Sequence, residues 1–166
     1  MVRTNQNAGS GLSTALLRSA KRNGIPMASK STLNAKNLEA LGAERLAQLL
    51  IEISTGDAAA KRKLRLALAG AEGPREAALE ITKRLTSIAK ARTFVNWQNR
   101  KPLVKDLQTQ RSAIMDEIAP HDPGEALALL WRLMGLATPV LERCDESCGT
   151  VIDIFHQACS DLGNAA

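Results

Sequence analysis

The stretch IAPHDPGEALALLWRLM, residues 118–134, predicts a helix with a defined start and a buried position. Asp122 stands at the N-cap, Pro123 at the first helical position and Glu125 at the third. This arrangement satisfies the backbone N–H groups that are free at the start of a helix. Residues 126–133 place apolar side chains on nearly every side, so we expect this helix at the centre of the fold.

The composition extends the helical prediction to the rest of the chain. Apolar residues make up 45% of the sequence, but only two Trp, two Phe and no Tyr are among them. The apolar content is therefore mainly Leu, Ala and Ile, which favour helices over strands. Helix starts near residues 34, 73 and 122 divide the chain into pairs of about forty residues without a detectable repeat. We predict an all-α protein, a helical array or α-α superhelix of about six to seven helices packed in pairs.

Further helix starts are predicted at Asp57, as an N-cap, and at Pro74 and Pro102, as first helical residues. The helix after Asp57 has an apolar stripe, which we expect to be buried, made of Ala60, Leu64, Ala67, Leu68 and Ala71. Its polar side carries Lys61, Arg62 and Arg65.

The chain divides by composition into a tail, residues 1–31, a single helical domain, residues 32–163, and a short end, residues 164–166. The tail contains basic residues but no acid, and Gly and Pro interrupt it. It resembles an organelle transit peptide in these respects, but we favour a flexible extension, or a natural start at Met27.

Charge is distributed unevenly along the domain. Residues 57–111 contain 13 basic and 5 acidic side chains, a net +8, whereas residues 112–166 contain 2 basic and 9 acidic ones, a net −7. The domain is therefore predicted to have a charge-polarised surface.

Residues 125–141 are the most apolar stretch, but they include Arg132 and Pro139 and are shorter than a typical membrane span, so we expect no membrane contact.

Three cysteines and a histidine lie in ERCDESCGTVIDIFHQAC, residues 142–159. On a helical wheel, two of these cysteines join an apolar face made of Cys148, Val151, Ile152, Phe155, Ala158, Cys159 and Leu162. His156 lies on the opposite face, about 12 Å along the axis from Cys148, which is too far for one zinc ion to bind both. We expect buried, reduced cysteines, no metal, no cofactor and a cytoplasmic protein.

Catalytic motifs are weak in this sequence. Asp153 and His156 are spaced to share one helix face, but such a pair is usually ordinary solvated surface. A glycine-rich phosphate loop followed by Lys-Ser or Lys-Thr is missing. We expect that the protein is not an enzyme.

The candidate interaction surface consists of Lys61, Arg62, Arg65, Arg92, Phe94, Trp97 and Arg100. The stretch RTFVNW, residues 92–97, interrupts the helical pattern, and we favour Phe94 and Trp97 as core residues that fill a groove between helices. The alternative is an exposed Trp97, flanked by arginines, on a binding surface. The basic segment 61–105 would suit nucleic acid, although side chains that stack on bases are scarce.

Several stretches together resemble a known family: LNAKNLEALG, RLALAG, RTFVNW, IAPHDPGEALALLWRLM and VLERCDESCG. They are similar to a bacterial family catalogued only as a domain of unknown function, over about residues 27–163. The resemblance implies an all-helical, superhelical fold, a cytoplasmic setting and no established activity.

Two functions remain open from the sequence. The first is a non-enzymatic helical interaction module that binds a partner protein or a second copy of itself. The alternative is a nucleic-acid-binding accessory protein that uses residues 61–105.

Overall fold

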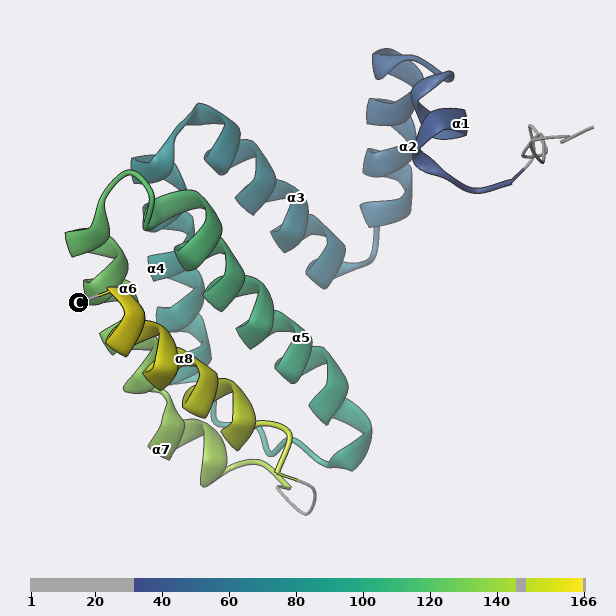
Figure 1. Cartoon of the computed structure of the whole chain (residues 1–166). Helices are drawn as coiled ribbons and strands as arrows, with labels where there is room; N and C mark the ends of the chain where they lie inside the picture. Colours follow the sequence, from purple (N-terminus) through teal and green to yellow (C-terminus); the bar gives the residue numbers. More distant parts are fainter. Residues whose placement is uncertain (1–31, 146–148, 166) are drawn as a thin grey trace, which may run out of the picture. The chain divides into compact units, whose positions relative to one another are not determined.

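The computed structural model describes residues 32–145 and 149–165. Every named element in them is helical, which confirms the all-α prediction (Figure 1). The predicted tail, residues 1–31, lies outside the described residues. The chain divides into two compact units, one up to Leu46 and one from Ala47, so a single domain over residues 32–163 stays a prediction.

The first unit contains α1, Ala35–Glu39, and the beginning of α2, Ala43–Ser54. The Asn34 side chain caps α1 by accepting a hydrogen bond of 2.9 Å from the Asn37 backbone N–H. Gly42 separates the two helices with a φ of 80°, a conformation that glycine adopts without strain.

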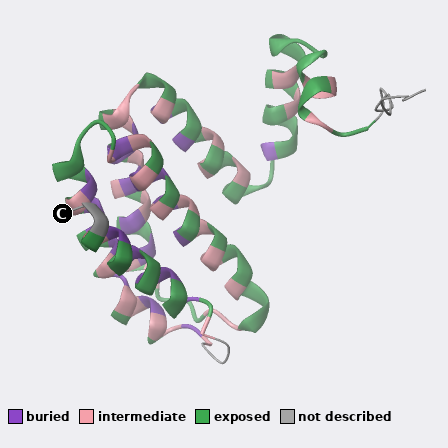
Figure 2. Ribbon diagram, in the orientation of Figure 1, coloured by how far each residue is buried: buried purple, intermediate pink, exposed green. Residues whose placement is uncertain are grey.

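The second unit is built around α4, Pro74–Lys90. Helices on several sides pack against α4, and its Ala77, Ile81 and Leu85 are fully buried. Figure 2 shows buried residues distributed along the helices of this unit. The other elements of this unit are α3 (Ala58–Glu72), α5 (Trp97–Ala113), the π-helical segment η1 (Ile114–Ile118), α6 (Pro123–Met134), α7 (Ala137–Leu141) and α8 (Ile152–Ala165). The core of this unit joins buried residues from α3 to α8, whereas residues 47–54 of α2 contribute none to it.

Local signals at three helix starts are confirmed. Asp57 accepts hydrogen bonds from the backbone N–H groups of Ala59 and Ala60, and Pro74 is the first residue of α4. Asp122 accepts a bond of 2.9 Å from the N–H of Glu125 at the start of α6. These caps are formed by residues a few positions apart, which is why the sequence predicts them.

The start predicted at Pro102 is wrong, because α5 begins five residues earlier. Asn96 is the N-cap and accepts a hydrogen bond of 3.0 Å from the N–H of Asn99. Pro102 consequently lies inside α5, where its missing N–H removes one backbone hydrogen bond close to the helix start.

The buried face of α3 also differs from the predicted stripe. Leu66 and Ala69 are buried, whereas Leu68 is 66% exposed and Ala67 and Ala71 are exposed as well. The predicted stripe follows hydrophobicity alone, but α3 turns the side that contains Arg62 toward α5. The face that α3 buries therefore depends on its neighbours α4 and α5, which the hydrophobicity of α3 alone does not reveal.

Helix α6 is central to the packing but is not buried all round. It packs against α4, η1 and α8 through Ala126, Leu129, Leu130 and Leu133, while Trp131 is 68% exposed. Among the described residues, Pro123–Leu141 is one helical stretch that is long and apolar enough to cross a membrane, although 33% of its best window is buried in the fold. Core helices of soluble proteins have the same composition, so this stretch is weak evidence for a membrane span.

Candidate interaction surface

The connection between α4 and α5 exposes two of the four aromatic side chains of the protein. Phe94 is 62% exposed and Trp97, the first residue of α5, is 65% exposed. The prediction that they fill a groove in the core is therefore wrong. Arg92 is exposed beside them, and Arg100 is half-buried. The exposure of Trp97 agrees with the alternative prediction, in which Trp97 is exposed and flanked by arginines.

Hydrogen bonds hold this connection to the segment that follows α7. The Val95 N–H donates to the Arg143 carbonyl at 2.8 Å, and the Val95 carbonyl accepts from the Asp145 N–H at 3.0 Å. Arg143 also donates from Nη1 to the Thr93 carbonyl at 3.1 Å, and Arg100 donates to the Asp145 carbonyl at 2.9 Å. Phe94 thus stands on a backbone that is fixed on both sides, with Val95 packed against the core.

The three predicted basic residues of α3 lie in two different environments. Lys61 and Arg65 are exposed. Arg62 is directed toward α5, where its Nη2 lies 3.8 Å from Oδ2 of Asp106 and its side chain is 36% exposed. The Lys61 and Arg65 side chains are therefore accessible to solvent, whereas Arg62 is part of a contact between helices.

Asp106 links three helices and was missed by the sequence analysis. Its Oδ2 accepts hydrogen bonds from Nε and Nη2 of Arg84 on α4, the first at 2.7 Å. Its Oδ1 accepts a bond of 3.3 Å from the Gln110 amide, and its side chain is only 12% exposed. One signal was available, because Asp106 is the one acidic residue between Glu80 and Asp116.

One cavity lies where α3, the end of α4 and the beginning of α5 meet, and Arg62 is the one predicted site residue in its lining. It has a volume of about 230 Å³ and is lined by Arg62 of α3, by Ala91 at the end of α4 and by Pro102 of α5. Phe94 and Trp97 do not line it. The structure therefore gives a basic cavity and, separately, an exposed aromatic pair on the adjoining connection.

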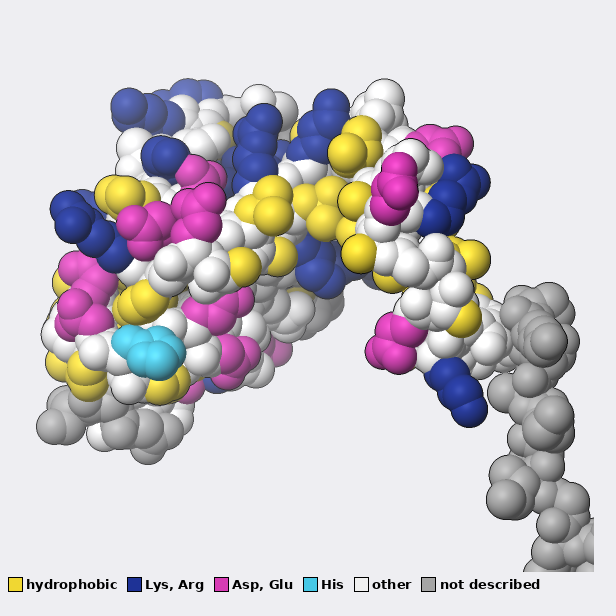
Figure 3. Space-filling view, turned by 90° about the horizontal axis from the view of Figure 1, so that it is seen from above, with side chains coloured by type: hydrophobic (Ala, Val, Ile, Leu, Met, Phe, Trp, Pro, Cys, Tyr) yellow, Lys and Arg dark blue, Asp and Glu magenta, His cyan; other side chains and the backbone are white. Residues whose placement is uncertain are grey.

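Opposite charges lie on different parts of the second unit. In Figure 3, most of its Lys and Arg side chains on the visible face stand along the upper edge, and acidic side chains gather below them, beside the histidine. Residues 57–111, with a net charge of +8, form α3, α4 and most of α5, and residues 112–166, with a net charge of −7, include η1, α6, α7 and α8.

The cysteine-rich stretch differs from its predicted arrangement. Helix α8 begins at Ile152, and Cys148 lies outside the described residues. Cys144 is buried, but Cys159 is exposed, so its placement on the core face is wrong. The buried face of α8 includes Phe155 and Ala158, as predicted, and also Ile154 and Asp161. Asp161 is paired with Arg111 of α5.

Asp153 and His156 are both exposed on α8. Within the described part of the chain, His, Cys, Asp and Glu side chains form no group of three or more that could hold a metal ion. Asp153 and His156 are spaced to share one face of this helix, but no hydrogen bond or ion pair joins their side chains.

Residues 28–166 match the model of a family of unknown function, DUF6880. The chain belongs to this family. The match confirms the resemblance seen in the sequence, and the DUF6880 region includes α3, α5 and the connection that carries Phe94 and Trp97. No curated protein and no solved structure matches the chain.

Proposed function

We propose that this protein is a non-enzymatic interaction module of the cytoplasm that binds an acidic partner protein through Phe94 and Trp97. The observation that supports the proposal most directly is the exposure of this aromatic pair on a hydrogen-bonded backbone. Large aromatic side chains presented in a fixed position are typical centres of binding energy, because little conformational entropy is lost when they enter a partner's pocket.

The sequence around the aromatic pair indicates the charge of the partner. Between Glu80 and Asp106 the chain contains no acidic residue, while Lys90, Arg92 and Lys101 are basic. A partner with an apolar pocket and an acidic rim would complement this surface. Charges at the rim of an interface mainly raise the association rate and set the orientation, whereas the buried aromatic contacts determine the affinity.

Substitution of the aromatic pair tests the proposal. The tagged full chain would be used to capture partners, and each candidate partner would be purified and its affinity measured directly. We expect Trp97→Ala and Phe94→Ala each to weaken binding by about 2 kcal/mol or more, the range of interface hot spots. Trp131→Ala is the matched control, since Trp131 is equally exposed but lies on α6.

This role is refuted if the Trp97→Ala and Phe94→Ala variants bind a partner as tightly as the wild-type chain does. Association with a second copy is tested with the same variants by sedimentation velocity. In that case Trp97→Ala is expected to shift the protein toward the monomer, and Trp131→Ala is not.

A groove between α3 and α5 favours a second candidate function, binding of nucleic acid. It has a volume of about 470 Å³ and is lined by Lys63, Lys101 and Lys105. Lysines along a groove neutralise phosphates and make affinity steeply dependent on salt. Combined Lys63→Gln, Lys101→Gln and Lys105→Gln should abolish such binding for every sequence tested and leave the binding of a protein partner through Trp97 largely intact.

Arg62 is a poor position at which to test the basic surface by reversing charge. A Glu at this position would face Asp106, so its effect on binding would be mixed with an effect on folding. Lys61 and Arg65 are exposed and are the appropriate α3 positions for reversing charge.

A further inference from the structure

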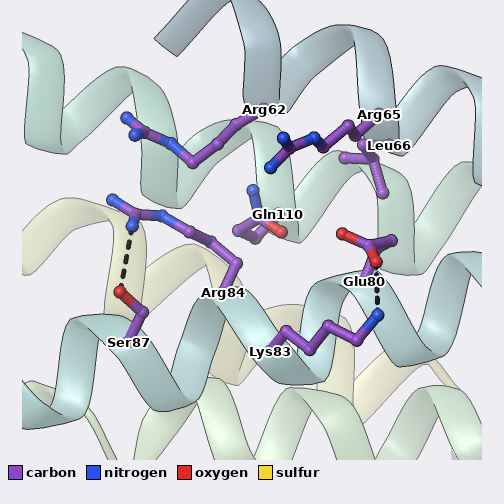
Figure 4. A pocket seen from close by; sticks show the side chains of 8 residues that line it. All are labelled: Arg62, Arg65, Leu66, Glu80, Lys83, Arg84, Ser87 and Gln110. Carbon is purple, nitrogen blue, oxygen red and sulfur yellow. Dashed lines mark hydrogen bonds and ion pairs between the residues drawn. The ribbon is translucent and has the colours of Figure 1, made fainter. Parts of the chain in front are cut away.

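A second basic cavity opens between α3 and α4, with α5 behind it (Figure 4). Its volume is about 230 Å³. The lining includes Arg62, Arg65, Lys83, Arg84, Ser87 and Gln110. In Figure 4 the side chains of Arg62 and Arg65 extend from α3 and that of Arg84 from α4, with Gln110 between them.

The cations of this cavity are incompletely neutralised. Lys83 pairs with Glu80 at 2.6 Å, and Arg84 is paired with Asp106. Arg62 reaches the same carboxylate oxygen only at 3.8 Å, and Arg65 has no ion-pair partner in the described part of the chain. The four cations therefore carry two more charges than the two carboxylates they contact, because Arg62 and Arg84 share Asp106 and Arg65 pairs with neither carboxylate.

Neutral hydrogen-bonding groups complete the cavity. The Ser87 hydroxyl accepts a bond of 3.3 Å from Arg84 Nη1 and keeps its own hydrogen for another acceptor. Gln110 is 4% exposed, and its side chain is held by the bond to Asp106. An anion that enters the cavity would thus meet guanidinium groups, a hydroxyl donor and a fixed amide, while the Glu80 carboxylate in the lining is neutralised by Lys83.

We propose that this cavity binds the terminal phosphate of a small phosphate monoester. A monoester phosphate carries close to two negative charges at neutral pH, which equals the excess charge of the cavity. Planar guanidinium groups donate paired hydrogen bonds that match phosphate oxygens. The assignment is independent of the aromatic pair, which lies outside this cavity.

A phosphodiester is a poorer match than a monoester. Each linkage in a nucleic acid backbone carries one negative charge and has two of its oxygens esterified, so it offers fewer acceptors to the guanidinium groups. The cavity is also a local hollow, whereas the groove lined by Lys63, Lys101 and Lys105 lies on the α5 side of α3.

Calorimetric titration of the full chain with glycerol 2-phosphate at low salt tests the proposal. Arg65→Gln and Arg62→Gln should each weaken binding by roughly tenfold, as is typical when a hydrogen bond between charged groups is lost. Lys61→Gln is the matched control, because it removes the same charge from an exposed position of α3 outside the cavity. Its affinity should stay close to that of the wild-type protein.

Two further measurements test the charge of the ligand. Dimethyl phosphate, a monoanion, should bind roughly tenfold more weakly than glycerol 2-phosphate. Lowering the pH from about 7.5 to about 5.5 should weaken the binding of glycerol 2-phosphate, since its second proton is gained near pH 6.

Three results would overturn the proposal. The first is no saturable binding of glycerol 2-phosphate at millimolar concentrations. The second is an equal loss of affinity in Lys61→Gln and Arg65→Gln, which would indicate attraction to overall charge alone. The third is binding of dimethyl phosphate or a single-stranded oligonucleotide that depends on Arg65 as strongly as the binding of glycerol 2-phosphate does.

Discussion

The Glu117 carboxylate of η1 lies directly against the backbone of Gly70 in α3, in the space that a Cβ atom at position 70 would occupy. Oε2 of Glu117 is buried and has no hydrogen-bond partner among the described residues. The position of the Glu117 side chain against α3 thus depends on a residue without a side chain. It also places a carboxylate oxygen where water cannot fully hydrate it.

A double-mutant cycle on this pair tests the contact. Alanine in place of glycine inside a helix contributes about 1 kcal/mol to stability. We expect Gly70→Ala to give that full gain only together with Glu117→Ala, because in the wild-type background the Glu117 carboxylate must first move away. Chemical denaturation of the four proteins measures the difference, and the same gain in both backgrounds would show that the side chains do not interact.

The sequence predicts the helix starts well and the buried faces less well, for a physical reason. A cap such as Asp57 or Asp122 acts on residues two or three positions away, so its partners are visible in the sequence. The face that a helix buries depends on its neighbours in space. On α8, for example, Asp161 lies on the core side because it pairs with Arg111 of α5. The distance between Nε of Arg111 and Oδ2 of Asp161 is 2.5 Å.

The sequence indicates the candidate surface but not the exposure of its aromatic residues. Aromatic residues are most often buried, which favoured a core position for Phe94 and Trp97. The structure shows instead that the smaller Val95 fills the inward position of the connection. An acidic residue that stands alone in a basic segment, as Asp106 does, indicates that this residue pairs with a basic side chain inside the fold.

Asp57 predicts a dependence of stability on pH. Hydrogen bonds from the backbone N–H groups of Ala60 and Ala59 hold the pKa of Asp57 below its ordinary value of 3.8. Because the folded pKa is the lower one, the cap contributes stability above the unfolded pKa and loses it as the pH falls through the folded value. We expect the wild-type protein to lose more stability than Asp57→Ser between about pH 5 and pH 2, as measured by urea denaturation. Parallel losses would contradict the role of the charge.

The two described thiols should differ in reactivity. In the Cys148→Ser background, which leaves only these two thiols, Cys159 is exposed and should react with Ellman's reagent at once. Cys144 is buried and should react only as the segment after α7 opens, at least about tenfold more slowly. The variant Cys148→Ser/Cys159→Ser should retain the slow phase alone. A single fast phase for two thiols would contradict the burial of Cys144.

The Asp106–Arg84 pair should contribute more to stability than the other ion pair of α4. Asp106 is 12% and Arg84 24% exposed, so removal of the carboxylate leaves a poorly hydrated cation close to Arg62. We expect Asp106→Asn to lower the free energy of unfolding by about 2 kcal/mol, the cost of leaving a partly buried charge without its partner.

Glu80→Gln is the matched control for this prediction. It breaks the ion pair with Lys83, whose side chain is 69% exposed, and should cost no more than about 0.5 kcal/mol because water screens the attraction. If Asp106→Asn is as mild as Glu80→Gln, Asp106 does not connect the helices energetically. Arg84→Gln should in turn reduce the cost of Asp106→Asn, because the charge that the carboxylate neutralises is then already gone.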